Sequence, residues 1–589
     1  MRAGLIILLF TISLSPIADF DLGMHLATGR RIAAEQAIPQ TDIFSYTRDG
    51  TYWPPHQAGS GWILYQIYQL SGFSGITIFK AILIVLIFLI PASTAVLSRE
   101  RREGVGMVDV RTDGGMTATG GITGWVLLVV LLAALAARSR FEMRPYLFST
   151  LGLAGLVHGL CRFDRTGRRR ELLLVVLIVA LGMNLHAGWI NGLLYTGLAI
   201  IGGALDRVRS QRSFFDFSDL QRMGAIGLGI LSGEGIARSI GLPGIASLEL
   251  PLMLFSDPYF KLHCAEFRPL AFTDWPILAL MSGLLLASCW NWRNRQWSTL
   301  LPLIGFSILT LSTVRLVIDW AVVAIVPAIN GLHALIAPGG FYQRLRPLGI
   351  AVVLVAITVF GDQNRSFGLG ISPRFYPDEA FRVLEQVQPA GKIFNEDAVG
   401  EWFSWRFGPI RKVFVDNRLE LYGAAFYQYR YWPIMNAQPG WEQLLDREGV
   451  THLLLWNSPA TIPLVGAAVR SPNWKTVFWN DHVVIFFHTQ KLKSLVERLG
   501  YTTLSPLDGG KAALTKPPEL VLPEIERMIR TAPLTSAGAH NLRGVVMARL
   551  GNDAAGCQEF RIALQIDAHQ RDAKRNLEKC RPDHQRRRR

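Results

Sequence analysis

Two aspartates and two histidines stand in one polar stretch near the beginning of the chain, between two apolar segments. Asp19 and Asp21 are two residues apart, His25 follows them, and His56 lies further along the stretch, which runs over residues 18–61. Charged side chains beside a bilayer cost free energy unless water, a partner or a ligand contacts them. A carboxylate can also act as a general base toward a hydroxyl group. These residues therefore form the first candidate site.

The competing interpretation is a solvated connector whose aspartates cap helices or form turns. It suits Asp42, which follows Pro39 in a run with the composition of a turn. It suits Asp19 and Asp21 less well, because they come directly after an apolar segment. Both aspartates therefore stay candidates for the base, and the residues alone do not separate them.

The elements that must position these residues are apolar. The chain has 589 residues, of which 50% are hydrophobic, and a mean hydropathy of +0.26. This combination indicates a polytopic membrane protein, mainly α-helical. A helix needs about 20 mostly apolar residues to cross the hydrocarbon core. Eleven segments are predicted to do so: 3–17, 73–97, 122–138, 144–161, 171–185, 187–205, 223–241, 274–291, 298–313, 316–337 and 347–361.

The basic residues predict an orientation. The formal net charge is +15, and alternate connectors between the apolar segments are rich in arginine. These connectors are 98–121, 162–170, 206–222, 292–297 and 338–346. Cytoplasmic connectors carry such an excess, so we expect a cytoplasmic N-terminus and, after eleven spans, an extracytoplasmic C-terminal region. Membrane orientation explains the positive charge without a nucleic-acid partner. Arg138, Arg140 and Arg144 are exceptions, because they fall on the outer side.

The C-terminal part has the composition of soluble domains, with an α/β domain expected over 362–500. A helix is predicted at 375–388, and strands at 392–396, 412–416, 451–456, 475–479 and 482–488, the last two joined by a tight turn at Asn480-Asp481. A linker over 501–533, a helical hairpin over 534–580 and a basic tail over 581–589 follow. The hairpin has the spacing of one tetratricopeptide repeat, which either caps the domain or docks a protein partner.

Several short motifs together resemble the bacterial branch of the multispanning GT-C glycosyltransferases. The first polar stretch carries Asp19-Phe20-Asp21, His25, Gly29 and His56-Gln57. Later matches are Arg144-Pro145, Asn184-Leu185-His186-Ala187-Gly188, Glu266-Phe267-Arg268-Pro269, Arg315 and the run 413–423. The sequence departs from the family pattern at Gly23-Met24, at Ala58 and over 231–247.

The resemblance implies a GT-C-like transmembrane domain over 1–361, with the acidic motif in a first extracytoplasmic loop over 18–72. It implies an inverting transferase in the bacterial inner membrane that moves a sugar from a polyprenyl-phosphate donor to a glycan, lipid or protein acceptor. Asp21, with Asp19 as the alternative, would be the general base. The residues that would bind substrate are His25, His56, Arg144, His186, Glu266 and Arg315.

The physical chemistry of such a reaction agrees with these assignments. The leaving phosphate gains negative charge, so it needs cations at the membrane edge. Arg144, His186 and Arg315 fall at the outer ends of predicted spans, on the same side as the aspartates. The alternative roles are snorkelling at the interface for Arg144 and hydrogen bonding between helices for His186.

Other classes of site are less well supported by the sequence. No Gly-rich phosphate loop is present to hold a nucleotide, which favours a lipid-linked donor. The five cysteines have no CxxC spacing, so no zinc site follows, although Cys557 and Cys580 could pair in an oxidising compartment. No cofactor is expected, and a divalent metal stays an open question. Two other functions stay open: a non-catalytic scaffold in envelope polysaccharide assembly or export, and a transporter, for which charges inside the spans are few.

Overall fold

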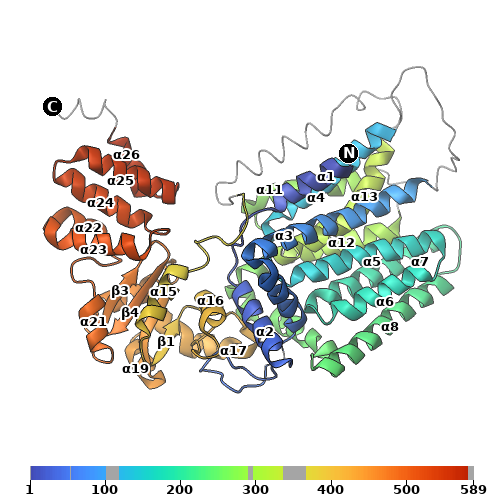
Figure 1. Cartoon of the computed structure of the whole chain (residues 1–589). Coiled ribbons are helices and arrows are strands. Elements are labelled where there is room, and N and C mark those ends of the chain that lie inside the picture. Colours follow the sequence, from blue (N-terminus) through green and yellow to red (C-terminus); the bar gives the residue numbers. More distant parts are fainter. Residues whose placement is uncertain (1, 54, 101–118, 290–295, 336–366, 581–589) are drawn as a thin grey trace. The chain divides into compact units, whose positions relative to one another are not determined.

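The computed structural model describes residues 2–53, 55–100, 119–289, 296–335 and 367–580 (Figure 1). These residues form two compact units. The first consists of Met1–Asp19, Thr28–Gln40 and Pro54–Gly370, and the second of Phe20–Ala27, Thr41–Trp53 and Ile371–Arg589. The chain therefore leaves the first unit directly after Asp19, and Asp21 belongs to the second.

The first unit is a bundle of helices. Its helices are α1 (Arg2–Ser13), α3 (Ala58–Glu100), α4 (Thr119–Ala136), α5 (Tyr146–Thr166), α6 (Arg170–Gly182), α7 (Ile190–Arg209), α8 (Phe217–Ile240), α9 (Glu249–Ser256), α10 (Pro258–His263), α11 (Trp275–Cys289), α12 (Trp297–Ser312) and α13 (Val317–Leu335). Helix α13 is central, because it packs against α3, α4, α5, α11 and α12 and its Trp320 and Ile325 are fully buried.

Ten of the eleven predicted apolar segments lie in these helices, and the eleventh, 347–361, lies outside the described residues. Within the described part of the chain, four helices are long and apolar enough to cross a membrane: Ala58–Ala95, Ala187–Arg209, Phe272–Cys289 and Val314–Leu332. Four more apolar helices are shorter. The protein is thus a helical membrane protein, and the number of spans stays a prediction.

The predicted loop over 18–72 is instead partly helical. It contains α2 (Leu22–Glu35) and the first part of α3, which is interrupted at Ser71 and Gly72 by non-helical backbone. Helix α2 has an apolar face, on which Leu22 and Leu26 are fully buried. The charged residues of this stretch made that face hard to recognise in the sequence. Gly29 explains how α2 and α3 approach each other, since a Cβ atom there would lie 2.2 Å from the carbonyl oxygen of Gly61.

The second unit contains a four-stranded sheet with the order β1-β2-β4-β3. Strand β1 (Lys392–Asn395) is parallel to β2 (Val450–Trp456), and β4 (Val483–His488) is antiparallel to both β2 and β3 (Trp474–Trp479). Around the sheet lie the helices α15 (Asp378–Val387), α16 (Asp397–Phe407), α17 (Leu419–Phe426), α18 (Trp432–Met435), α19 (Trp441–Glu448), α20 (Ile462–Arg470) and α21 (Lys493–Leu499).

Four of the five predicted strands and the helix before them are confirmed, but the predicted strand at 412–416 is wrong. Val413 makes a single isolated bridge with Ser45. The next amide, of Phe414, donates to the side-chain oxygen of Asn395 at 2.9 Å. The Asn395 side chain therefore accepts the hydrogen bond that a neighbouring strand would otherwise accept. Within the described residues, no ladder of backbone hydrogen bonds forms along this run.

Five further helices follow the sheet: α22 (Gly509–Thr515), α23 (Pro518–Thr531), α24 (Ala537–Arg549), α25 (Asp553–Ile566) and α26 (Arg571–Glu578). The predicted linker at 501–533 is therefore largely helical, because Val521, Ile525 and Met528 form one core with Leu542 and Val546. Cys557 and Cys580 form a disulfide. Helices α24 and α25 form the predicted hairpin and are joined at Gly551-Asn552.

Candidate functional site

Six charged side chains meet in the first unit, at the ends of several helices. Asp19 lies in the segment after α1, Arg140 ends the short helix η1 (Arg138–Arg140), and Glu142 and Arg144 lie between η1 and α5. Glu266 lies in η4 (Ala265–Phe267), and Arg315 lies in η7 (Val314–Leu316), directly before α13. We call these six residues the ion cluster. They come from parts of the chain up to about 300 residues apart.

Arg144 is the centre of the ion cluster. Its Nη2 atom lies 2.8 Å from Oδ1 of Asp19, and its Nε atom lies 3.0 Å from both oxygens of that carboxylate. On its other side, Nη1 donates to Oε1 of Glu266 at 2.6 Å. The planar guanidinium therefore bridges two carboxylates through charge-assisted hydrogen bonds, a geometry that lysine could not reproduce.

Glu266 is contacted by three arginines. Besides Arg144, Nη1 of Arg140 lies 3.2 Å and Nη1 of Arg315 lies 3.4 Å from its carboxylate oxygens. Burial acts to raise the pKa of Glu266, but Arg144, Arg140 and Arg315 outweigh it and lower that pKa to about 2. The hydroxyl of Thr313 donates to the carbonyl oxygen of Glu266 at 3.0 Å, which holds the segments before α11 and α13 together.

The cations of the ion cluster are only partly hidden. The side chain of Asp19 is 0% exposed, whereas those of Arg144 and Arg315 are 22% and 31% exposed. Arg140 is buried over the ring of Tyr146, and its Nε and Nη2 atoms make no hydrogen bond within the described part of the chain. Buried donors normally find a partner. The cluster thus combines accessible cations with unused donors, an arrangement suited to an anionic ligand.

Asp21 has a different environment, in the second unit. Its Oδ1 atom accepts a hydrogen bond from Nδ2 of Asn417 at 3.1 Å. The neighbouring carboxylate of Glu401 accepts from the backbone amides of Asn417 at 2.9 Å and Met24 at 3.1 Å. Burial raises the pKa of Glu401 well above its ordinary value, and the charges of Asp416 and Asp21 raise it further. Asp21 itself is half-buried.

The departure from the family pattern at Gly23 has a steric explanation in the same place. A Cβ atom on Gly23 would lie 2.6 Å from the backbone carbonyl of Glu401. Only glycine therefore fits where the beginning of α2 packs on α16. The family pattern has bulkier residues here, and none of them fits this packing.

A second Asp–Arg cluster is buried inside the second unit, and we call it the buried triad. Arg418 donates to Asp416 through Nε at 2.8 Å and Nη2 at 2.7 Å, and its Nη2 also lies 2.8 Å from Oδ1 of Asp42. The exposed fractions are 6% for the Arg418 side chain and 0% for both carboxylates. Asp42 also accepts from the amides of Phe44 and Ser45, which confirms its predicted role in a turn.

The three predicted histidines belong to different elements of the chain. His186 ends the segment before η2 (Ala187–Trp189), and its Nδ1 atom accepts from the amide of Gly188 at 3.0 Å and lies 2.8 Å from Oγ of Ser149. His25 lies on α2 and is half-buried. His56 lies directly before α3 in the first unit. The contacts of His186 are those of a helix cap.

Of the predicted site residues, the structure brings Asp19, Arg144, Glu266 and Arg315 together. Sequence reasoning missed Arg140, Glu401 and Asn417. Arg140 had a signal, because it belongs to the group of outer arginines that violates the positive-inside trend. Asn417 belonged to the matched run 413–423, although nothing there indicated its contact with Asp21. Glu401 had no signal, since its contact with Met24 joins residues almost 400 positions apart. Within the described ranges, no group of three or more His, Cys, Asp or Glu side chains could hold a metal ion.

Comparison with known proteins supports the fold and only the fold. No protein-family model matches the chain, and no curated protein matches its sequence. Among solved structures, it is similar to the archaeal oligosaccharyltransferase AglB from Archaeoglobus fulgidus in complex with an inhibitory peptide and a dolichol-phosphate. The sequence identity is 11%, the TM-score is 0.50, and the match covers 93% of this chain and 85% of that one. This chain therefore has a fold similar to that of the oligosaccharyltransferase AglB.

Two further structures of the Archaeoglobus fulgidus oligosaccharyltransferase also match. The apo form has a TM-score of 0.46 at 12% identity, with 77% of this chain and 69% of that chain covered. The complex with Zn and sulfate has a TM-score of 0.45 at 12% identity, with 95% and 85% covered. The conclusion on fold rests on the complex with the peptide and the dolichol-phosphate.

Proposed function

We propose that this protein is a membrane glycosyltransferase that moves a sugar from a polyprenyl-phosphate donor to a glycan, lipid or protein acceptor on the outer face of the membrane. The observation that carries the proposal is the convergence of Arg140, Arg144 and Arg315 on Glu266 in the ion cluster. When the sugar leaves, a phosphate diester becomes a monoester and gains charge. Cations that are already fixed in place stabilise that charge in the transition state.

The environments of the two aspartates favour Asp21 as the general base. The carboxylate of Asp19 is fully buried and bridged by Arg144, so it is a poor proton acceptor. Asp21 is half-buried and accepts a hydrogen bond from the neutral amide of Asn417. Two residues of chain span at most about 7 Å, so Asp21 cannot lie far from Asp19 along the backbone. We therefore assign Asp19 to holding Arg144, and Asp21 to accepting the proton of the acceptor hydroxyl.

One structural neighbour supports a lipid-phosphate donor and a protein acceptor in this proposal. AglB was solved with a dolichol-phosphate and an inhibitory peptide. A lipid phosphate fits the three arginines of the ion cluster by charge, and a peptide is one of the acceptor classes that the sequence suggested. The transferred sugar is left open by these observations.

The cysteines support an extracytoplasmic position for the second unit. Cys557 and Cys580 are paired, and disulfides persist mainly in oxidising compartments. The arginine-rich connectors give the same orientation. Both observations support our proposal that the C-terminal region lies outside the cytoplasm and that the protein belongs to the bacterial inner membrane.

The test is sugar transfer by the full-length protein in membrane vesicles, with a panel of undecaprenyl-phosphate hexoses carrying a radiolabelled sugar. We expect Asp21→Asn to abolish transfer while the protein still inserts and keeps its thermal stability. The matched control is Asp49→Asn, since Asp49 lies in the same N-terminal region, is 54% exposed and pairs with Lys412. Full activity of Asp21→Asn would refute the assignment of the base.

One observation favours the scaffold as the second candidate function. The three arginines of the ion cluster are balanced by three carboxylates, Asp19, Glu142 and Glu266, so the cluster is electrically neutral without a ligand. Purification from membranes distinguishes the two candidates. A stoichiometric partner that stays bound after mutation of Asp19 and Asp21 or depends on α24–α26, combined with no turnover of any lipid-linked sugar, would favour a scaffold.

A further inference from the structure

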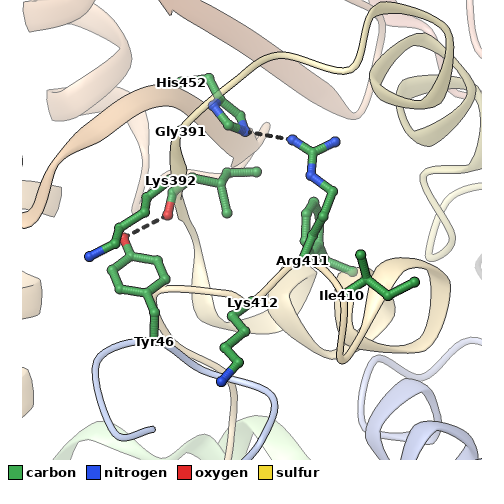
Figure 2. A pocket seen from close by; sticks show the side chains of 9 residues that line it. Tyr46, Gly391, Lys392, Ile410, Arg411, Lys412 and His452 are labelled. Atoms are coloured by element: carbon green, nitrogen blue, oxygen red, sulfur yellow. Dashed lines mark hydrogen bonds between the residues drawn. The ribbon is translucent and has the colours of Figure 1, made fainter.

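A cavity of about 210 Å³ in the second unit has an excess of positive charge (Figure 2). Lys392, Arg411 and Lys412 line it together with Tyr46, Phe403 and His452. Pockets for drug-sized ligands are usually larger, at about 300–1,000 Å³. The cavity is thus suited to a molecule no larger than a single sugar. It involves none of the residues assigned to sugar transfer.

The buried imidazole of His452 holds Arg411 without neutralising it. Figure 2 shows the guanidinium of Arg411 pointing toward the ring, and its Nη2 atom lies 3.2 Å from Nε2 of His452. The other ring nitrogen, Nδ1, lies 2.9 Å from the hydroxyl of Thr451, which itself donates to the carbonyl oxygen of Ala390. Burial, and then the charge of Arg411, lower the pKa of His452 to about 3. The imidazole is therefore neutral at physiological pH, and its Nε2 atom accepts a hydrogen bond from Arg411.

Two of the three cations have no carboxylate partner. In the part of the chain that the structure describes, neither Arg411 nor Lys392 forms a salt bridge within 4.0 Å. Arg411 donates to the carbonyl oxygen of Pro389 at 3.3 Å and lies over the ring of Phe407. Lys392 lies over the ring of Tyr46, with Nζ 4.7 Å from the ring centre. Only Lys412 has a carboxylate, Asp49 at 2.5 Å.

This pattern differs from that of an ordinary surface. Two partly buried arginines in the same unit do have carboxylate partners: Arg406 binds Glu385, and Arg430 binds Glu448. Burial lowers the pKa of Arg411, and no neighbouring carboxylate raises it again. A desolvated cation without an anion is costly, and a bound anion would remove that cost.

We propose that this cavity binds a small anion, namely a carboxylate or phosphate group on a molecule of sugar size. Arg411 and Lys392 contact the anionic oxygens, while Phe403 and Ile410 cover the apolar face of the ligand. An acidic sugar and a phosphate would bind through the same cations. The site lies entirely within the second unit, so the inference holds whether or not the proposed transfer reaction is correct.

The test is isothermal titration calorimetry of the full-length protein in lipid nanodiscs, at constant ionic strength. Inorganic phosphate, glucuronate and glucose are titrated separately. We expect phosphate, glucuronate or both to bind with millimolar or tighter affinity, and glucose to show no binding. Binding of phosphate alone identifies a phosphate-bearing ligand, and binding of glucuronate identifies a carboxylate-bearing one. If neither anion binds, the proposal is overturned.

Single substitutions test whether the anion binds in this cavity. Arg411→Gln should weaken anion binding at least tenfold, and Lys392→Gln should weaken it severalfold. Lys392 is exposed, so we expect Lys392→Gln to fold normally. This variant therefore tests the proposal even if Arg411→Gln does not fold. The matched control is Arg382→Gln, because Arg382 lies on α15, is 50% exposed and pairs with Asp378. Anion binding that is equally strong in Lys392→Gln and Arg382→Gln would place the anion elsewhere and refute the proposal.

Discussion

The ion cluster and the buried triad use the same chemistry in opposite environments. In both, an arginine bridges two carboxylates at distances between 2.6 and 3.0 Å. In the triad, Arg418 and its two aspartates are almost completely buried. In the ion cluster, Arg144 and Arg315 keep 22% and 31% of their side-chain surface, and Glu266 has three arginines instead of one.

The difference separates a structural group from a candidate ligand site. Removing one partner of a fully buried ion pair leaves an uncompensated charge in a medium of low polarity. The triad can therefore only hold Thr41–Trp53 to the start of α17. The ion cluster is neutral as a whole, but two of its cations, Arg144 and Arg315, are partly exposed, so an anion can contact them without leaving any buried charge unpaired. Burial and redundancy, more than residue type, distinguish the two clusters.

The largest expected effect is on stability, in the triad. Arg418→Gln leaves Asp42 and Asp416 buried without a cation, so we expect the free energy of unfolding to fall by about 3–5 kcal/mol. Chemical denaturation of the purified full-length protein, followed by tryptophan fluorescence, measures this change. The exposed Arg382→Gln serves as the control and should stay within about 0.5 kcal/mol of the unmodified protein. A similar small change in Arg418→Gln would show that burial does not distinguish the clusters.

The next effect is on activity, in the ion cluster. Arg315 lies 3.4 Å from Glu266 and over the ring of Phe267, and it is partly exposed, so Arg315→Gln should change stability little. Loss of a cation aimed at the developing charge typically costs about 100- to 1,000-fold in kcat. We expect a loss of this size in sugar transfer from undecaprenyl-phosphate hexose. An unchanged kcat, with only stability affected, would make Arg315 a structural residue like Arg418.

A smaller effect concerns acid stability. The pKa of Glu266 in the folded protein is about 2, below its ordinary value of 4.5. The corresponding stabilisation is complete above about pH 4.5 and disappears as the pH falls through about 2, and it amounts to about 3 kcal/mol. In Glu266→Gln this pH dependence should be absent. Thermal unfolding between pH 7 and pH 2 measures it, and two parallel curves would contradict the role of the arginines.

Part of this architecture could be predicted from the sequence. Long apolar segments predicted helices correctly, because a run of about 20 apolar residues has few other stable forms near a bilayer. Short runs of β-branched and aromatic residues predicted β1 to β4. The charge trend drew attention to Arg144 because the predicted orientation puts it on the outer side, against that trend.

The other features of the fold and of the site could not be predicted, because they depend on contacts between residues that are far apart in the sequence. Helix α2 was not predicted, because Arg30, Arg31 and Glu35 make its sequence polar. Its other face is nevertheless apolar and buried. The run at 412–416 has the composition of a strand, yet the side chain of Asn395 takes the place of a strand partner. Glu401 has no local motif, and only its contact with Met24 shows that it borders Asp21. The parallel pairing of β1 with β2 is equally non-local.

The most direct test of the account is whether the arginines of the ion cluster bind the phosphate of a prenyl lipid. The quantity to measure is the affinity of the protein for a prenyl phosphate. Native mass spectrometry of the full-length protein with undecaprenyl phosphate can compare the unmodified protein, Arg315→Gln and the control Arg382→Gln. The account predicts that Arg315→Gln binds at least tenfold more weakly and that Arg382→Gln binds as the unmodified protein does. Equal affinity in all three proteins would contradict it.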